Sequence, residues 1–240
     1  MRIAVIIPTY CEERMLPVTL AALHQHGRSA TVIVADCGST DETTRLAREA
    51  GATVLHGPEL VNRASAMNAG ATWVIRNEPD IEALWFLHAD TAPPPEWDCM
   101  IAEVLADQRV VGGAFRMVWN RNEIPRWMRV RLGALALINR MRYELTSSYF
   151  GDQGIFVRRT AFERIGGFPD VPLLEDVVLC RALRGIGVVR LAPATVVTSP
   201  RRFVRHGPIR QSLLDLGLLT AERLGLQPTR IHAWYNRERE

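Results

Sequence analysis

The first part of the chain alternates between short apolar runs and segments with helical spacing. The apolar runs are residues 3–7, 31–35, 52–55 and 83–87. None of them alternates with polar residues, which is typical of strands buried on both faces of a parallel sheet. Leucines recur at helical intervals in the first gap, and residues 63–77 form a helical pattern in the third. This order predicts an open α/β sheet with right-handed crossovers, whose ligands bind at the carboxyl ends of the strands.

Two boundary signals frame the helix predicted in the second gap. Ser39-Thr40-Asp41-Glu42 has the spacing of a capping box, and Gly51 is a C-terminal stop signal. After the proline run at 93–95 the regular alternation ends. Residues 110–118 and 154–157 have the pattern of strands, residues 126–142 that of a basic helix, and a further helix begins at Asp176. We therefore expect the second half of the chain to be appended to the first half, whose sheet is of the kind that binds nucleotides.

Composition narrows the class of protein. At 240 residues and 48% hydrophobic, the chain is long enough for one domain with a sizeable core. Its 29 basic and 26 acidic residues give a net charge of +3, which offers no argument for a nucleic-acid partner. The four cysteines lie far apart without a C-x-x-C pair, so we expect free thiols in a reducing, cytoplasmic compartment.

No apolar run approaches the roughly 18 to 20 residues that span a bilayer. Residues 208–226 are moderately amphipathic. This stretch is compatible with two interactions. One is peripheral contact with a membrane surface, and the other is helix packing in a homodimer.

Polar clusters follow three of the predicted strands, at residues 8–12, 36–39 and 88–91. Asp36 is placed to accept hydrogen bonds from a base or from ribose hydroxyls, and a turn carboxylate is the alternative. His88 and Asp90 point to the same side if the strand continues through them. Asp90 suits Mg²⁺ or Mn²⁺ whose coordination is completed by phosphate oxygens. His88 either binds the metal, which favours Mn²⁺, or hydrogen-bonds a neighbour.

Other charged groups stand near predicted helix starts. Arg63 and Asn68 begin the third helix, where free N–H groups favour phosphate. They are five residues apart and share no helical face, so either Arg63 precedes the helix or only one of them reaches the ligand. Asp176 is either a general base or a helix cap. The basic run at 201–206 either clamps a diphosphate or forms a solvated edge.

Two common nucleotide-binding motifs are missing from the sequence. No G-x-G-x-x-G follows the first strand, and no G-x-x-x-x-G-K-[ST] occurs anywhere. Dehydrogenases and P-loop proteins are therefore disfavoured.

Several motifs occur in a fixed order along the chain. They are Ile6-Ile7-Pro8-Thr9-Tyr10-x-Glu12-Glu13, Ala35-Asp36-x-Gly38-Ser39-Thr40-Asp41, Arg63-x-x-x-Met67-Asn68-x-Gly70, Leu87-His88-Ala89-Asp90-Thr91, Tyr149-Phe150-Gly151-Asp152-Gln153-Gly154, Gly166-Gly167-Phe168-Pro169, Glu175-Asp176 and Thr198-Ser199-Pro200-Arg201-Arg202. Their order and spacing resemble the family 2 glycosyltransferases over nearly the whole chain. Within that family they resemble the radical-SAM/selenodomain-associated, arsenosugar-biosynthesis type of sequence.

The resemblance implies a single GT-A domain over residues 1–240, with a nucleotide-sugar-binding half at 1–92 and an acceptor half at 93–240. It implies inverting transfer of a sugar from a nucleoside-diphosphate sugar, often a UDP sugar, to an acceptor hydroxyl with the help of Mg²⁺ or Mn²⁺.

Site residues also follow from the resemblance. Asp176 would be the general base, with Glu175 and Asp152 lining the acceptor pocket. Asp90 would bind the metal, and His88 stands where the family usually has a second aspartate. The donor side would consist of Pro8, Tyr10, Glu12, Asp36, Arg63, Asn68, Ala89 and Arg202.

The histidine leaves one carboxylate for the metal. A non-catalytic sugar-nucleotide-binding protein of the same fold is therefore the alternative function, although the retained Asp90 and Asp176 favour an enzyme. Nucleotidyl transfer is disfavoured because no glycine-rich basic loop follows the first strand.

Overall fold

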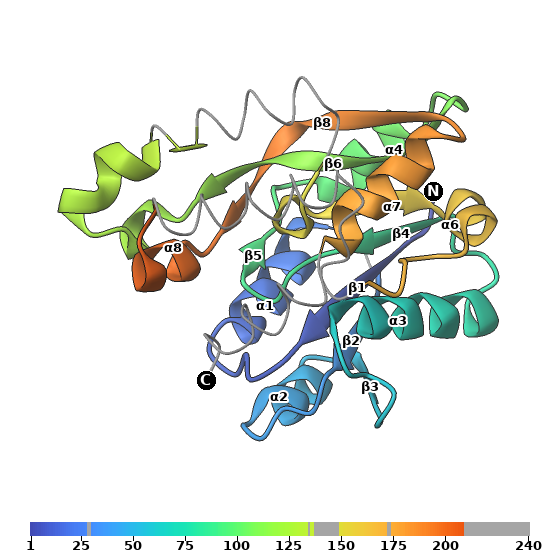
Figure 1. Ribbon diagram of the computed structural model, residues 1–240. Coiled ribbons are helices and arrows are strands. Elements are labelled where there is room, and N and C mark those ends of the chain that lie inside the picture. Colours follow the sequence, from blue (N-terminus) through green and yellow to red (C-terminus); the bar gives the residue numbers. More distant parts are fainter. Residues whose placement is uncertain (28–29, 134, 137–148, 172–173, 209–240) are drawn as a thin grey trace.

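Four parallel strands form the half of the sheet that comes first in the sequence (Figure 1). They are β1 (Ile3–Thr9), β2 (Thr31–Asp36), β3 (Thr53–His56) and β4 (Ala83–Phe86). Three helices connect them, α1 (Leu16–His26), α2 (Thr43–Glu49) and α3 (Arg63–Asn77). The computed structural model describes all residues except 28–29, 134, 137–148, 172–173 and 209–240. The predicted strand–helix order is confirmed.

The second half of the chain extends the same sheet, which has eight strands in the order β3-β2-β1-β4-β7-β6-β8-β5. Its strands are β5 (Thr91–Ala92), β6 (Val110–Trp119), β7 (Ile155–Arg158) and β8 (Val188–Thr198). Its helices are α4 (Trp97–Val104), α6 (Arg159–Ile165), α7 (Glu175–Arg184) and α8 (Arg201–His206), with 3-10 turns η1 (Arg121–Glu123), η2 (Arg126–Met128) and η3 (Gly151–Gln153). β7 runs antiparallel to β4, so the sheet is mixed.

Side chains alternate between two hydrophobic cores, one on each face of the sheet. Ile3, Val5 and Ile7 of β1 pack with residues of α1 and α4, whereas Ala4 and Ile6 pack with residues of α3, α6 and α7. Both sets are buried, which explains the continuous apolar run in the sequence. β3 differs from the prediction, because it is an edge strand with half-buried and exposed side chains.

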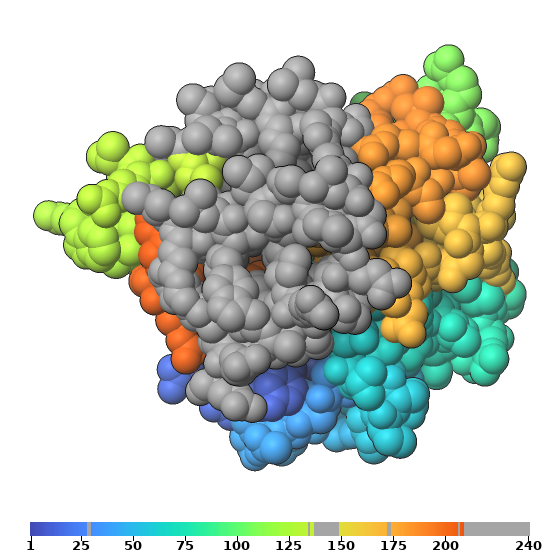
Figure 2. Space-filling model, in the orientation of Figure 1, coloured from blue at the N-terminus to red at the C-terminus, as the bar shows by residue number. Residues whose placement is uncertain are grey.

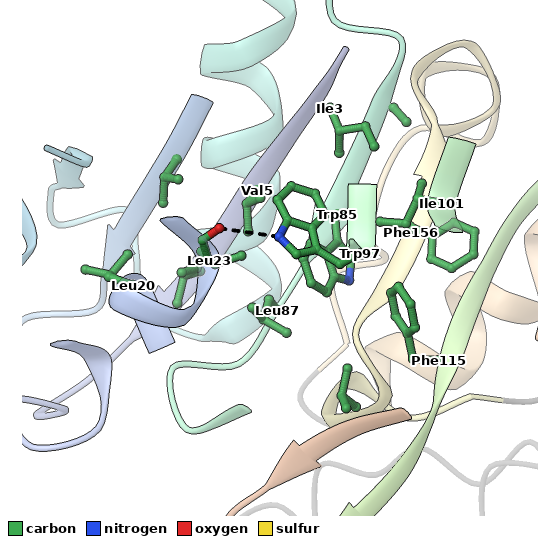
Figure 3. Packing of buried hydrophobic residues seen from close by; sticks show 14 of the residues in the cluster. Ile3, Val5, Leu20, Leu23, Trp85, Leu87, Trp97, Ile101, Phe115 and Phe156 are labelled. Carbon is green, nitrogen blue, oxygen red and sulfur yellow. Dashed lines mark hydrogen bonds between the residues drawn. The ribbon is translucent and has the colours of Figure 1, made fainter. Parts of the chain in front are cut away.

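Two tryptophans fix the first core against the second half of the chain (Figure 3). The Trp85 and Trp97 rings have centroids 4.7 Å apart, and Trp97 Nε1 donates to the Leu23 carbonyl at 3.5 Å. Trp85 Nε1 donates to the Gly154 carbonyl at 3.1 Å. This bond ties β4 to the turn between η3 and β7, and η3 borders the site described below.

Several local predictions need correction. The capping box at residues 39–42 does not form, because α2 begins after Glu42 without a side-chain cap. Asp41 instead accepts a hydrogen bond from the Thr43 N–H at 3.1 Å. Gly51 does follow the helix end, at a φ of 82° that glycine adopts readily. A capping box is present at α3, where Asn62 and Ser65 exchange hydrogen bonds.

Parts of two predicted segments lie outside the described residues. Of the predicted basic helix at 126–142, residues 126–128 form η2 and 129–133 are helical, while 137–142 are outside that part. Of the amphipathic stretch at 208–226, residues 209–226 are outside it. Within the described ranges, no helix combines the length and the apolar character needed to cross a membrane. All four cysteines are free, as expected.

Candidate active site

Most of the predicted site residues lie at the carboxyl ends of β1, β2 and β4, and on the segments of the second half that face them. This is the edge at which ligands of parallel α/β sheets bind. The contacts divide these residues into three groups, which are the loop after β2, a buried charge cluster around Arg63, and an ion-pair network around Arg201.

Asp36 organises the loop after β2. Its side chain is 2% exposed and accepts hydrogen bonds from the Thr9 hydroxyl at 3.0 Å and from the Gly38 and Ser39 N–H groups at 3.1 and 2.8 Å. The Ser39 hydroxyl donates to the same carboxylate. This geometry matches the turn-carboxylate alternative, in which Asp36 shapes the loop. Ser39 Oγ in turn accepts from the Cys11 N–H at 2.8 Å, so the loops after β1 and β2 are joined.

The charge cluster consists of Arg63, His88, Glu175 and Asp176. Arg63 Nε forms an ion pair with Glu175, and Arg63 Nη1 lies 3.3 Å from His88 Nε2. The Glu175 side chain is 4% exposed, whereas that of Arg63 is 37% exposed. Glu175 is therefore covered by the guanidinium. Arg63 is the first residue of α3 and Glu175 the first of α7, so this pair joins the two halves of the chain.

Asp176 is the member of the cluster whose two oxygens both accept backbone hydrogen bonds. Oδ2 accepts from the Gly151 N–H at 2.7 Å, and Oδ1 accepts from the Val177 N–H at 2.8 Å. The N-cap of α7 is Leu174, so Asp176 is a first-turn residue and not the cap that the sequence left open. Asp176 is only 4% exposed.

The electrostatics of this cluster follow from burial. Burial, together with the neighbouring Glu175 charge, raises the pKa of Asp176 to about 6, against the opposing effect of Arg63. Burial also holds the pKa of His88 well below its usual value, and the positive charges of Arg63, Arg202 and Arg201 act in the same direction. His88 is therefore a neutral imidazole at neutral pH. Burial opposes the charge on Arg63, but Glu175, Asp176 and Asp152 more than offset it and raise its pKa.

Gly151 brings the η3 turn into contact with this cluster. A Cβ atom at this position would lie 2.5 Å from His88 Nε2 and 3.5 Å from Asp176 Oδ2. Only glycine fits here without displacing a neighbour. Next to it, Gln153 is 1% exposed and anchors the turn, because its Nε2 donates to the Phe115 carbonyl at 3.1 Å.

Arg201 of α8 holds the second ionic network. Its Nη1 lies 2.8 Å from Glu12 Oε2, its Nη2 also pairs with Glu12, and Nη2 lies 3.2 Å from Asp90 Oδ2. The Asp90 side chain is 14% exposed. Burial raises the pKa of Asp90, Arg201 lowers it, and Glu12 raises it. The predicted metal ligand is thus already in contact with a cation.

His88 and Asp90 do not continue β4. The strand ends at Phe86, and the Thr91 N–H donates to the His88 carbonyl at 3.1 Å across a turn. The condition under which both side chains would point to one side, a strand that continues through them, is therefore not met. His88 joins the cluster around Arg63, and Asp90 joins Arg201.

A divalent metal, which the family resemblance of the sequence implies, fits the site only as a sparsely coordinated ion. Among the residues that the structure describes, no three His, Cys, Asp or Glu side chains are grouped to hold a metal. The two carboxylates Glu12 and Asp90 do accommodate a positive charge, since Arg201 lies between them. Such a site supplies one or two ligands, and substrate phosphates must supply the others.

The remaining predicted residues have diverse surroundings. Asn68 is engaged with the segment between α6 and α7, because it donates to the Phe168 carbonyl and accepts from the Phe168 N–H, each at 2.9 Å. Ala89 is buried, and its carbonyl accepts from the Thr19 hydroxyl at 2.7 Å. Pro8 is half-buried within β1, Tyr10 is 64% exposed just after it, and Arg202 is exposed on α8. Asp152, in η3, is half-buried and close enough to Arg63 to raise its pKa.

Three contacts of the site could not be read from the sequence as specific partners. They are the pairing of Arg201 with Glu12 and Asp90, the Gly151 N–H on Asp176, and the covering of Glu175 by Arg63. For the contacts of Arg201, the basic run at 201–206 was the only indication in the sequence. The residues of the first pair lie 189 positions apart, and nothing local specifies such a contact.

This mixed sheet, with its loops at the carboxyl ends of β1, β2 and β4, is the GT-A fold. Residues 4–166 match the family model described as glycosyl transferase family 2, and the chain belongs to that family.

Among curated proteins, the chain is 31% identical over 163 residues to an undecaprenyl-phosphate 4-deoxy-4-formamido-L-arabinose transferase of Aeromonas hydrophila, covering 65% of this chain and 48% of the relative. It is 33% identical over 125 residues to an undecaprenyl-phosphate mannosyltransferase of Micrococcus luteus, covering 47% and 51%. The chain thus spans about half the length of the curated relatives it matches.

Among solved structures, the chain resembles the mannosyltransferase PcManGT of Pyrobaculum calidifontis, determined in complex with GDP-Man and Mn²⁺. The TM-score is 0.62 at 21% identity, over 82% of this chain and 56% of that one. At 21% identity, this likeness supports a shared fold and nothing further.

Proposed function

We propose that this chain is an inverting glycosyltransferase, which moves a sugar from a nucleoside-diphosphate sugar to an acceptor hydroxyl with inversion at the anomeric carbon and with Asp176 as the general base. The observation that carries this proposal is the position of Asp176, a buried carboxylate held by the Gly151 N–H at the junction of the two halves, where burial raises its pKa to about 6. A base with a pKa just below neutral is ionised at pH 7 and still basic enough to take a proton.

In the proposed displacement, the acceptor oxygen forms a bond to the anomeric carbon while its proton passes to Asp176. The bond between that carbon and the diphosphate oxygen breaks, and the nucleoside diphosphate leaves with the electron pair. Arg63 lies beside Asp176 and is partly exposed, so its cation is placed to stabilise the charge on the leaving group. Residues 1–92 would bind the donor, and residues 93–240 would bind the acceptor.

The contacts refine the proposed role of several residues. Tyr10 and Pro8 would contact the nucleoside, with Asp36 holding the loop in shape from below. Glu175 would position Arg63, because it is covered by that side chain. Asp90 would hold Mg²⁺ or Mn²⁺, with His88 as a neutral ligand or a neighbour. A bound divalent ion would supply further positive charge next to the diphosphate.

A lipid phosphate is the second candidate acceptor, because both curated relatives are named as undecaprenyl-phosphate transferases. A phosphate oxygen is largely ionised at neutral pH, since the second pKa of a phosphate monoester is about 6. Such an acceptor would need little help from a base. The two acceptors therefore predict different consequences of removing the Asp176 carboxylate.

Three finer assignments remain proposals of the same kind. UDP is the nucleotide that the sequence resemblance favours, whereas PcManGT was determined with GDP-Man. Membership of the arsenosugar-biosynthesis type of subgroup rests on the resemblance of the sequence motifs alone. A non-catalytic protein that binds a sugar nucleotide is the alternative to the enzyme.

The test combines binding and turnover. We would titrate the protein with UDP and with GDP, each with Mn²⁺ and with EDTA, and then measure release of nucleoside diphosphate from the matching sugar nucleotides with water as acceptor. For Asp176→Asn we expect unchanged nucleotide affinity and a loss in rate of about 10² to 10⁴. Unchanged turnover would remove Asp176 from the mechanism. If Asp176→Asn loses water-dependent release but keeps transfer to undecaprenyl phosphate, the lipid phosphate is the acceptor.

A further inference from the structure

An exposed basic and aromatic surface lies on the segment that follows β6. Trp127 is 68% exposed and Val130 is 83% exposed, the highest exposure among the exposed large hydrophobic side chains of the described chain. Arg126, Arg129 and Arg131 alternate with them and are also exposed. In Figure 2 this lime-coloured segment stands out from the rest of the described molecule at the left of the view.

The exposure is not that of a loosely packed loop, because the opposite side of the segment has its own core. Met128 is 2% exposed and Leu132 is fully buried. Both belong to a hydrophobic cluster with Trp119 and Ile124, against which Phe203 and Val204 of α8 pack. Trp127 and Val130 therefore project outward from a segment whose inner face is fixed.

The charge of the surface is predominantly positive. Residues 120–132 contain four arginines, Arg121, Arg126, Arg129 and Arg131, and a single acidic residue, Glu123. Glu123 accepts hydrogen bonds from Asn120 Nδ2 at 2.7 Å and from the Ser199 hydroxyl, so its carboxylate is engaged toward η1 and Ser199 and it offsets one of the four positive charges. Exposed tryptophan and valine among arginines that outnumber the acidic residue four to one are the chemistry of a surface that meets anionic lipid head groups.

We propose that the surface formed by Arg121, Arg126, Trp127, Arg129, Val130 and Arg131 docks the enzyme on an anionic membrane. The arginines would contact lipid phosphates, and Trp127 and Val130 would enter the boundary between head groups and acyl chains. This inference rests on the proposed function and deepens it. If the chain transfers a sugar, docking on a membrane would place its acceptor at the membrane surface.

A chain of contacts joins the docking surface to the candidate active site. Trp119, in the core beneath the surface, lies 4.8 Å from Phe203 of α8 between ring centroids. Two residues earlier, Arg201 of the same helix pairs with Glu12 and Asp90. Figure 1 shows α8 beside the segment after β6, on the same side of the molecule. An acceptor held in the bilayer would thus be presented next to the loops that hold the donor.

The test uses vesicles and needs no substrate. The probes are sucrose-loaded vesicles of phosphatidylcholine alone and of phosphatidylcholine with phosphatidylglycerol, sedimented with the full chain at low and high salt. We expect the protein to bind the anionic vesicles, to bind the neutral ones weakly, and to dissociate as salt rises. The triple variant Arg126→Gln, Arg129→Gln, Arg131→Gln should bind the anionic vesicles on the order of a hundredfold more weakly.

A matched triple variant controls for net charge. Arg48→Gln, Arg76→Gln and Arg164→Gln remove three exposed arginines from α2, α3 and α6 and should leave vesicle binding nearly unchanged. Trp127→Ala should weaken binding by about tenfold, because the aromatic side chain no longer enters the interface. Val18→Ala, at an exposed valine of α1, should not. Melting curves identify any variant that fails to fold. If either the arginine triple variant or Trp127→Ala does not fold, the other of the two decides the test.

Four results would overturn the proposal. They are wild-type binding that does not prefer anionic vesicles, equal losses in both triple variants, tighter binding to a short nucleic-acid duplex than to vesicles, and a Trp127→Ala variant that loses self-association but not vesicle binding. Nucleotide titration of the same samples keeps the hypotheses apart. Vesicle binding without nucleotide binding would remove the proposed function alone, and nucleotide binding without vesicle binding would remove the docking surface alone.

Discussion

The properties of Asp176 are set by a few neighbouring groups. Burial and the Glu175 charge favour its protonated form, whereas Arg63 and the Gly151 and Val177 N–H groups favour the carboxylate. The first set prevails and raises its pKa to about 6. A general base must be ionised, so the rate should fall as the pH drops through this value.

This argument gives a prediction about the pH profile. With water as acceptor, release of nucleoside diphosphate should lose its rate below about pH 6. Glu175→Gln removes a negative charge that raises the pKa of Asp176 and releases Arg63 from its partner, so the acid limb should move to lower pH. Glu163→Gln, at an exposed glutamate paired with Arg159, is the control and should leave the profile in place. An acid limb that stays fixed in Glu175→Gln would show that Asp176 is not the titrating group.

Gly151 gives a second prediction at this scale. In Gly151→Ala the new Cβ would lie 2.5 Å from His88 Nε2, and His88 is itself held against Arg63. Relief requires a shift of the cluster, so we expect a loss of about 1–3 kcal/mol in unfolding free energy and at least tenfold in turnover. Gly133→Ala adds a Cβ into open space on a helix and should be neutral or slightly stabilising. Urea denaturation and the release assay measure both, and equal behaviour of the two variants would contradict the close packing at Gly151.

At the scale of elements, Asn68 links α3 to the turn that leads toward α7. Its side chain makes two hydrogen bonds to the backbone of Phe168, next to Gly166 and Gly167, which both have positive φ. The family resemblance implies that Asn68 lies near the diphosphate, and its contacts in the structure add a second hypothesis, in which it clamps a backbone segment of the second half.

The clamp predicts a split between stability and nucleotide binding. Asn68→Ala leaves the Phe168 N–H and carbonyl without their partner and should cost about 1–3 kcal/mol of unfolding free energy, with nucleotide affinity unchanged. Turnover should fall, because α7 carries Asp176. Asn77→Ala, on the exposed end of the same helix, removes one bond to the Trp73 carbonyl and should cost less than about 0.5 kcal/mol. If Asn68→Ala weakens nucleotide binding and leaves stability intact, the diphosphate role is correct.

How far the sequence predicts each element depends on the kind of strand. Continuous apolar runs identified β1, β2 and β4 because both faces of these strands are buried. β8 escaped prediction, since it mixes exposed and buried residues and contains Pro193. Pro193 lies where the register of β6 and β8 shifts between Ala114 and Arg116, so the ladder tolerates its missing N–H. A proline at such an irregularity looks in the sequence like the end of a strand.

At the scale of the molecule, the strand order shows which part of the site could be foreseen. β6, β7 and β8 join the sheet beyond β4 in an order that does not follow the sequence. The loops after β1, β2 and β4 were predicted to meet, because parallel strands end at one edge. The second half brings Arg201 and Asp176 to that edge through contacts over long separations, such as Arg201 with Glu12, which no local pattern specifies.

The pairing of Arg201 with Asp90 gives the last prediction. A divalent ion and a guanidinium compete for the same carboxylates, since both are cations and Asp90 Oδ2 already lies 3.2 Å from Arg201 Nη2. Removing the guanidinium in Arg201→Gln should therefore strengthen binding of Mn²⁺ in the absence of nucleotide, by about tenfold or more, as measured by the electron paramagnetic resonance of the free ion.

The same substitution should have the opposite effect on the nucleotide. When a metal occupies Asp90, Arg201 is free to pair with the diphosphate, so Arg201→Gln should weaken the binding of nucleoside diphosphate in the presence of Mn²⁺. Arg205→Gln, an exposed arginine of the same helix, should change neither affinity. Unaltered Mn²⁺ binding in Arg201→Gln would exclude Asp90 as the metal ligand. Tighter Mn²⁺ binding with weaker nucleotide binding would instead identify Arg201 as a cation that leaves Asp90 when the donor and its metal bind, which would couple the end of the described chain to the first steps of the reaction.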